Sequence, residues 1–134
     1  MTPTGAAIDI WMLLIGRVLL AMVFLVSGIH KALWYRKAVD EFTADGAPLV
    51  AVTLPATIAL HVGGALCLIF GLYVTAAALA LAGFTLLATF LGHSFWRLDG
   101  DDRLIRSRTF LGNLAVIGGL LYLAAVGPGP LALG

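Results

Sequence analysis

The chain has 134 residues, of which 61% are hydrophobic and 11% are charged, and its mean hydropathy is +1.05. Soluble domains average about 45–50% apolar and about 25% charged residues, and a domain this small buries only about 60–70% of the surface that its unfolded chain exposes. So much apolar sequence excludes a soluble enzyme and a disordered tail. A formal net charge of +1 gives no attraction to nucleic acid, so we expect none as a partner. The lipid bilayer is the expected surrounding.

Four apolar segments predict four membrane-spanning helices, at about residues 8–30, 50–74, 75–93 and 110–126. Each crossing of a hydrocarbon core about 30 Å thick needs about 20 residues. The connection between the second and third segments is only a few residues long, which forces an antiparallel helical hairpin. We therefore expect an all-α fold, an integral membrane four-helix bundle that is antiparallel with short connections, and a single membrane domain over residues 1–134.

The basic residues predict the orientation of these helices. All of them except Arg17 lie in the first and third connections. Because basic connections remain in the cytoplasm, residues 31–48 and 94–109 are predicted to be cytoplasmic and both termini to lie outside.

Small residues spaced four apart predict where the helices touch, because helices in lipid associate through close contact at small side chains. They also fit an interface between copies of the chain. Cys67 is the one cysteine, so no internal disulfide can form, and we interpret it as a small buried hydrophobic residue. The stripes are Gly63, Cys67 and Gly71, then Ala76 and Ala80, then Ala115 and Gly119.

Arg17 is the sharpest anomaly, because it lies about nine residues into the first predicted span. A charge at that depth costs about 2.5–3.5 kcal/mol on translocon scales and marks a candidate functional site. No acidic residue lies deep within a predicted span: Asp9 is at the outer end of the first, and the others are in the connections. Arg17 either extends outward to Asp9 or lipid phosphate, or faces inward to backbone carbonyls, a neutral histidine or a ligand.

Other polar residues gather toward the predicted cytoplasmic side. His61 lies within the second span, where burial favours the neutral imidazole, and either an interhelical hydrogen bond or a ligand would satisfy it. Lys31, His93 and Asn113 end or begin their spans at one membrane face, together with His30. The candidate site is therefore Arg17, Lys31, His61, His93 and Asn113. We expect no metal centre, because histidines without nearby carboxylates bind iron or zinc poorly.

A series of short motifs resembles the DoxX family over about residues 16–121. The resemblance implies a small four-helix bacterial inner-membrane protein and marks Arg17, Lys31, His93 and Asn113 as recurrent polar positions. This chain departs from the family at the second span, which usually carries a glutamate just before its Gly-Gly pair as a counter-ion for Arg17; here the nearby polar residue is His61. The motifs are Gly16-Arg17, Ser27-Gly28-Ile29-His30-Lys31, Gly63-Gly64, Gly71, His93-Ser94-Phe95-Trp96, Phe110-Leu111-Gly112-Asn113-Leu114 and Gly118-Gly119.

Two functions from different classes fit these features. Some DoxX relatives belong to membrane thiosulfate:quinone oxidoreductases, so the chain is interpreted as a component of a quinone-linked membrane oxidoreductase system. A quinone would then be held by Arg17, His61 and Asn113, with no cofactor bound covalently and with electrons supplied by other membrane protein subunits. The alternative is a non-catalytic accessory or assembly subunit of a larger membrane complex, in which Arg17 pairs with a carboxylate of a neighbour.

Overall fold

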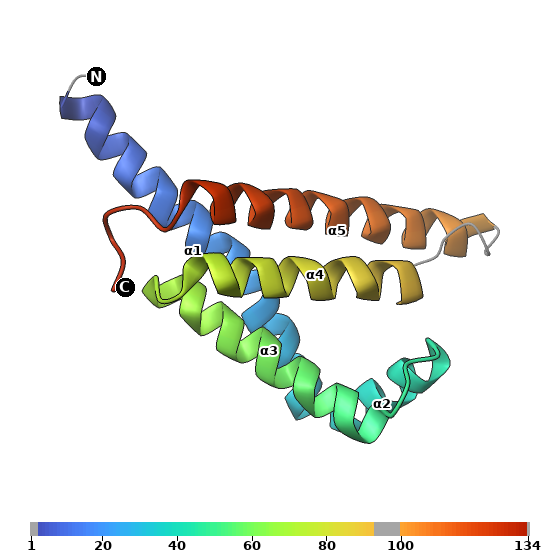
Figure 1. Ribbon diagram of the computed structural model, residues 1–134. Helices are drawn as coiled ribbons and strands as arrows, with labels where there is room; N and C mark the ends of the chain where they lie inside the picture. The colour runs from blue at the N-terminus through green and yellow to red at the C-terminus, as the bar shows by residue number, and fades with distance from the viewer. Residues whose placement is uncertain (1–2, 93–99, 134) are drawn as a thin grey trace.

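The computed structural model describes residues 3–92 and 100–133, and all regular structure in those two stretches is helical (Figure 1). The predicted all-α class is therefore confirmed. In chain order the helices are α1 (Pro3–Leu33), α2 (Tyr35–Ala44), α3 (Val50–Phe70), α4 (Val74–Gly92) and α5 (Gly100–Val126).

Three of these helices are long and apolar enough to cross a membrane. The qualifying segments are Asp9–Leu33, Val50–Phe70 and Arg103–Val126. The shortest of them, α3, has 21 residues, and at 1.5 Å per residue it extends about 31 Å, the thickness of a hydrocarbon core. In α4 the apolar part is Val74–Phe90, which extends only about 25 Å.

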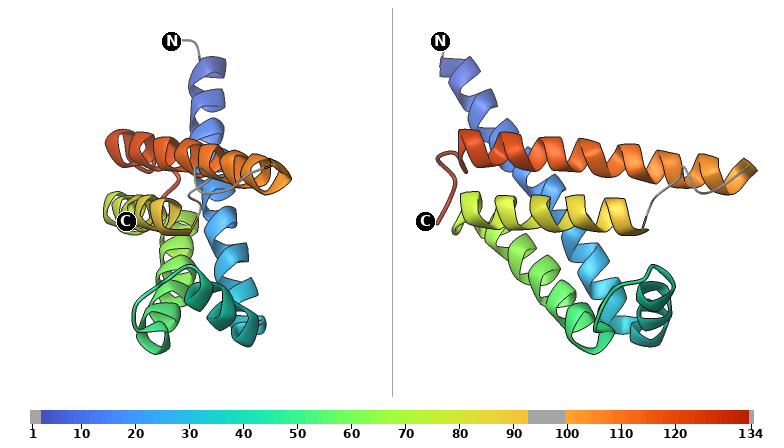
Figure 2. Two further views of the ribbon diagram at one scale, coloured as in Figure 1. Left: turned by 90° about the vertical axis from the view of Figure 1, so that its right-hand side faces the viewer. Right: turned by 45° about the vertical axis from the view of Figure 1, so that its right-hand side comes forward.

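The four long helices form two antiparallel pairs. Helix α1 packs along α3, and α4 packs along α5. The pairs meet near the α3–α4 turn and then diverge, so that α4 and α5 run across the first pair in the views of Figure 2. The expected single antiparallel bundle is therefore not confirmed.

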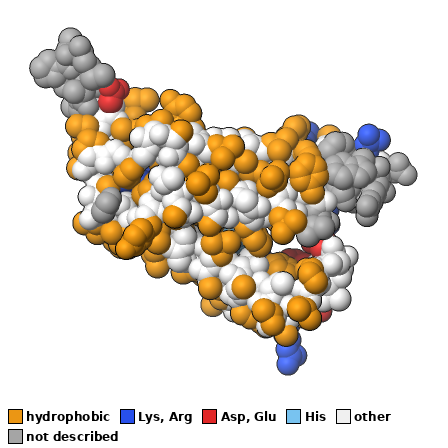
Figure 3. Space-filling model, viewed as in Figure 1, with side chains coloured by type: hydrophobic (Ala, Val, Ile, Leu, Met, Phe, Trp, Pro, Cys, Tyr) orange, Lys and Arg blue, Asp and Glu red, His pale blue; other side chains and the backbone are white. Residues whose placement is uncertain are grey.

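The core lies where the two helix pairs meet. Ala21 and Phe24 of α1 pack with residues of α3, α4 and α5 there, among them Ala65, Leu81 and Leu120. Figure 3 shows hydrophobic side chains over most of the visible face and charged ones mainly toward its ends. A lipid-facing surface with charges at the two water-facing levels has this distribution.

The small residues predicted to lie at contacts between helices are mostly not at such contacts in the structure. Gly64 is buried, with Leu81 of α4 about 3.1 Å from where a β-carbon would lie, whereas Gly63 is exposed with nothing within 4 Å. Ala76, Ala80 and Ala115 are also exposed. The prediction is right at Gly119 and Gly71, which lie close to Leu20 of α1 and Ala132. It is wrong at the exposed positions, because a spacing of four does not fix the rotation of a helix about its axis. Cys67 is half-buried and not fully buried as interpreted.

The first connection, residues 31–48, contains a helix that the sequence analysis did not predict. Helix α2 begins after Trp34, whose ring stacks on His30 at 4.7 Å between centroids. One side of α2 is anchored by Ala38, which is buried, and most of its other residues are exposed. This short amphipathic helix packs on α1 and α3, at the end of that pair farthest from the α3–α4 turn (Figure 1).

Candidate functional site

Arg17 lies inside the protein and binds backbone carbonyls at one end of the structure. Its side chain is only 2% exposed. Nη1 donates to the carbonyl oxygen of Pro128 at 2.8 Å, and Nη2 donates to that of Leu131 at 2.5 Å and more weakly to that of Ile69 at 3.5 Å. Of the two arrangements open from the sequence, the structure has the inward one, with carbonyls as partners. Arg17 therefore ties the C-terminal tail (residues 127–133) to α1 and α3.

The same carbonyls explain how the chain accommodates a cation without a neighbouring carboxylate. Ile69 belongs to the last turn of α3, and Pro128 follows the end of α5 by two residues. The C-terminal end of a helix carries a partial charge of about −0.5, so the end of α3 near Ile69 also attracts the guanidinium. Backbone carbonyls of the tail and of this helix end therefore bind Arg17 where the family resemblance implies a glutamate.

Gly71 allows this close approach. It ends α3 in the left-handed region with φ 72°, and its N–H and that of Leu72 donate to the Cys67 carbonyl, as in a glycine-based helix cap. A β-carbon at Gly71 would lie 2.5 Å from the Ala132 β-carbon and 3.0 Å from Nη1 of Arg17. Any larger residue would push the tail and the guanidinium away.

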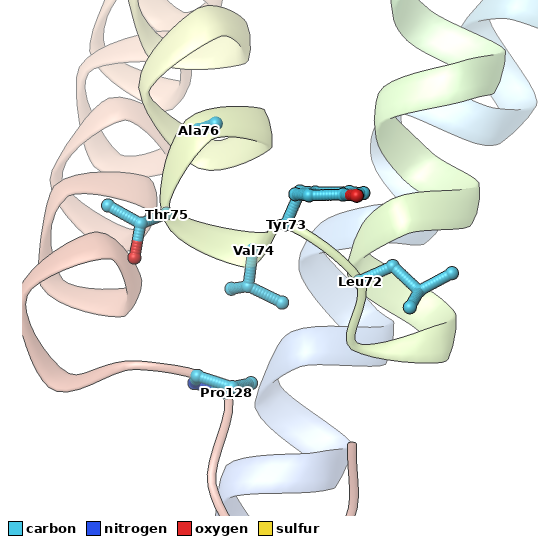
Figure 4. A pocket seen from close by; sticks show the side chains of 6 residues that line it. All are labelled: Leu72, Tyr73, Val74, Thr75, Ala76 and Pro128. Atoms are coloured by element: carbon cyan, nitrogen blue, oxygen red, sulfur yellow. The ribbon is translucent and has the colours of Figure 1, made fainter. Parts of the chain in front are cut away.

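A hollow of about 520 Å³ lies between this tail and the α3–α4 turn, lined by Leu72, Tyr73, Val74, Thr75, Ala76 and Pro128 (Figure 4). Its lining offers little chemistry. The Thr75 hydroxyl donates to the Ala124 carbonyl of α5 at 3.4 Å, and Tyr73 is 81% exposed. We place no functional site there.

His61 lies further along α3, between aromatic rings from two other helices. Its ring contacts Phe24 of α1 and Phe84 of α4 edge to face, with centroids 5.4 and 5.0 Å apart. The side chain is 5% exposed, and neither Nδ1 nor Nε2 has a hydrogen-bond partner in the described structure. An imidazole has one donor and one acceptor when neutral, and leaving such groups unsatisfied in the interior costs about 1–3 kcal/mol. A buried ring with both nitrogens unpartnered is the strongest indication of a ligand site in the described residues.

The His61 ring lines a cavity of about 320 Å³ in the region where the two helix pairs diverge. It is here called the His61 cavity. Lys31 and Asn113, two of the predicted site residues, line it as well. Nζ of Lys31 donates to Oγ of Ser27 at 2.5 Å, which holds the ammonium group beside the cavity. The remaining lining residues are Val23, Phe24, Ser27, Glu41, Phe42, Asp45, Phe84, Thr85 and Ala88.

Two acidic residues of this cavity were missed in the sequence interpretation. Glu41 belongs to α2 and Asp45 is the residue that ends it, and both line the cavity with Lys31. Their spacing of four places them on one face of a helix, and this was the available signal. Thr85 was also missed; it is buried, and its hydroxyl donates to the Leu81 carbonyl at 2.7 Å. The cavity therefore has its carboxylates at the α2 side, while its imidazole, ammonium and amide come from α3, α1 and α5.

The structure separates the predicted site residues into two groups. Lys31, His61 and Asn113 meet at one cavity, whereas Arg17 binds near Ile69, eight residues or about 12 Å along α3 from His61. Arg17 and His61 therefore do not face one another. His30 is exposed and is not part of the cavity lining, and His93 lies outside the described residues.

No group of three or more histidine, cysteine, aspartate or glutamate side chains in the described residues is placed to hold a metal ion. Glu41 and Asp45 do share the cavity with His61, so the expectation that no carboxylates lie near the histidines is wrong. The donors that the cavity offers are an imidazole, an ammonium and an amide. Such groups suit a ligand with acceptor oxygens.

A helical protein with apolar segments of membrane-spanning length is an integral membrane protein. The polar cavity between its two helix pairs is its candidate functional site. The family profile described as DoxX matches residues 12–94. The chain belongs to the DoxX family, as its motifs indicated.

Two relatives are known as inner-membrane proteins of Escherichia coli strain K12. The chain is 38% identical over 116 residues to inner membrane protein YqjF, covering 87% of this chain and 84% of the relative. It is 27% identical over 129 residues to inner membrane protein YphA, covering 96% of this chain and 91% of the relative. No solved structure matches it significantly.

Proposed function

We propose that the protein is the quinone-binding component of an inner-membrane oxidoreductase system, with the His61 cavity as its site. The observation that carries the proposal is the buried His61 ring, both of whose nitrogens lack a partner beside a cavity in the described structure. Quinone carbonyls are acceptors, and an imidazole N–H, the Lys31 ammonium and the Asn113 amide are donors that would bind them. Phe24 and Phe84 give the apolar walls that such a ring needs.

Each residue would have a distinct role. The N–H of His61 would donate to one carbonyl oxygen, while its other nitrogen would accept a proton from the α2 side of the cavity. Glu41 and Asp45 would exchange protons with water at that side, because both are exposed as well as lining the cavity. Electrons would come from a partner membrane subunit, since the sequence contains no recognisable redox cofactor motif.

The proposed orientation in the membrane follows from the basic residues of the first and third connections. All four long helices would cross the bilayer. The apolar part of α4 is shorter than that of the others, so α4 would either tilt less or lie where the bilayer is locally thinner. Residues 31–48 and 94–109 would be cytoplasmic and both termini outside. The proton-exchanging side of the cavity would then face the cytoplasm.

A single replacement tests the quinone site. His61→Phe removes both unpartnered nitrogens while keeping an aromatic ring against Phe24 and Phe84. We expect the free energy of unfolding to rise by about 1–2 kcal/mol, because two unsatisfied polar atoms are lost, while quinone binding falls at least tenfold. His30→Phe is the matched control, since His30 is exposed outside the cavity.

Binding would be measured by native mass spectrometry and by titration of the purified protein with a benzoquinone in mild detergent. Stability would be measured by denaturant unfolding in the same detergent. Unchanged quinone affinity in His61→Phe would overturn the proposal, and so would wild-type protein that binds no quinone. A destabilised His61→Phe protein would show that the ring nitrogens have partners in the folded protein.

The alternative function, a non-catalytic accessory subunit, is based mainly on a carboxylate of another subunit that would pair with Arg17. The guanidinium is bonded to carbonyls of its own chain and is 2% exposed. Partner subunits remain part of the proposal as electron donors.

A further inference from the structure

A second cavity adjoins the His61 cavity on the side of α4. It has a volume of about 180 Å³ and is here called the Leu87 cavity, after a residue that lines it and is 61% exposed. The two cavities share four lining residues, so they touch across a common wall. The shared residues are Phe42, Asp45, Phe84 and Ala88.

The chemistry changes across this wall. The His61 cavity holds an imidazole, an ammonium and an amide, whereas Ala47, Pro48, Leu87 and Thr53 are the further residues around the Leu87 cavity. Thr53 offers little there, because its hydroxyl donates to the carbonyls of Pro48 and Leu49 at 3.0 and 3.1 Å. Apart from Asp45, which lies in the shared wall, the lining of the Leu87 cavity is uncharged and mostly apolar, so this cavity suits an apolar group and the His61 cavity a polar one.

The Leu87 cavity also lies beside a surface of exposed apolar side chains. Leu86, Leu87 and Phe90 of α4 are 45%, 61% and 51% exposed, so this stretch of α4 presents large hydrophobic side chains outward. The other wall is the connection from α2 to α3, which contains Ala47 and Pro48. The Leu87 cavity therefore adjoins the polar cavity on one side, at Phe42 and Phe84, and an exposed apolar stretch of α4 on the other.

We infer that the Leu87 cavity binds the apolar tail of the ligand whose polar head occupies the His61 cavity, and that the opening between α4 and the α2–α3 connection is where that ligand enters from the bilayer. The inference rests on the proposed function. It assigns the ligand to one class, an amphiphile with a flat acceptor head and an isoprenoid or alkyl tail, rather than a water-soluble acceptor. Phe42 and Phe84 lie where head and tail join.

Ala47→Trp tests the path, because its indole would fill the Leu87 cavity without adding atoms to the His61 cavity. Ala44→Trp is the matched control, since Ala44 is exposed at the end of α2 and lines neither cavity. Leu87→Gln is a milder second variant that places an amide in the apolar cavity from an exposed position. Each purified, folded protein would be titrated in one detergent with a decyl-tailed benzoquinone and with the same benzoquinone lacking the tail.

We expect Ala47→Trp to lower the affinity for the tailed quinone at least tenfold and Leu87→Gln to lower it severalfold. Both variants should bind the tailless quinone with the affinity of the wild type. Ala44→Trp should bind both normally. Equal affinity of Ala47→Trp and wild type for the tailed quinone would overturn the tail path, as would an equal loss of both quinones. If Ala47→Trp does not fold, unchanged tailed-quinone affinity in Leu87→Gln overturns it.

The failure of the tail path and the failure of the quinone site give different results. If wild type binds both quinones and His61→Phe binds neither, the head site stands whatever the tail variants do. If wild type binds neither quinone, the proposed function fails and the tail path fails with it.

Discussion

Replacing Arg17 with leucine should release the C-terminal tail and destabilise the whole fold. The guanidinium makes two short hydrogen bonds, to the carbonyls of Pro128 and Leu131, and one longer bond to that of Ile69. A hydrogen bond to a charged group contributes about 1.5–3 kcal/mol net, so the two short bonds together contribute about 3–6 kcal/mol. Leucine would fill much of the volume but leave those carbonyls without a donor.

Two assays would follow the change. Denaturant unfolding in mild detergent should show a loss of about 3–6 kcal/mol in Arg17→Leu. A smaller loss is expected for Arg17→Lys, because an ammonium is a point charge that does not present the planar fork spanning two carbonyls. Tail release would be followed with Ala132→Cys in a Cys67→Ser background, since Ala132 is half-buried against Gly71 and should react faster with a maleimide once the tail is free.

Arg36→Leu is the control for the loss of a positive charge, because Arg36 is exposed on α2. It should change the free energy of unfolding by less than about 0.5 kcal/mol. The reasoning would be refuted if Arg17→Leu unfolded like wild type and left the labelling rate at Ala132→Cys unchanged. Loss of quinone binding in an Arg17→Leu protein that stays folded with its tail bound would also contradict it, since Arg17 lies away from the His61 cavity.

Two glycines give further predictions, both measured against Gly63→Ala, which has open space around it and should behave as wild type. Gly71→Ala should destabilise the protein by at least about 2 kcal/mol, because it combines a strained left-handed residue with overpacking against Ala132. An unchanged free energy of unfolding would show that the tail is not held against Gly71. Gly28→Ala should push α1 away from α3, because its β-carbon would lie 2.8 Å from Val62 beside His61. We expect a loss of about 1–3 kcal/mol in unfolding experiments and weaker quinone binding in titrations, and normal binding would show that the cavity tolerates the shift.

The sequence by itself determined that this is a helical membrane protein, which family it belongs to and about where its four apolar helical segments lie. These properties are local, because hydropathy, helix length and turn residues act over about 20 residues or fewer. Helix α5 begins at Gly100, ten residues before the predicted segment, because its first turns are polar and hydropathy does not mark them. The same reasoning identified Lys31, His61 and Asn113 as candidates, because a polar residue in an apolar segment is conspicuous without any knowledge of its neighbours. It also identified Arg17 as an intramembrane charge in need of compensation.

Only the tertiary structure decided what those side chains face. Arg17 binds carbonyls 111 and 114 residues further along the chain, and no pattern of spacing in α1 encodes partners so distant. The rotation of each helix about its axis, which exposes Gly63 and buries Gly64, is set by packing against the other helices and not by spacing alone. The divergence of the two helix pairs opens the cavity that brings Glu41 to His61, and it arises from contacts among all four long helices.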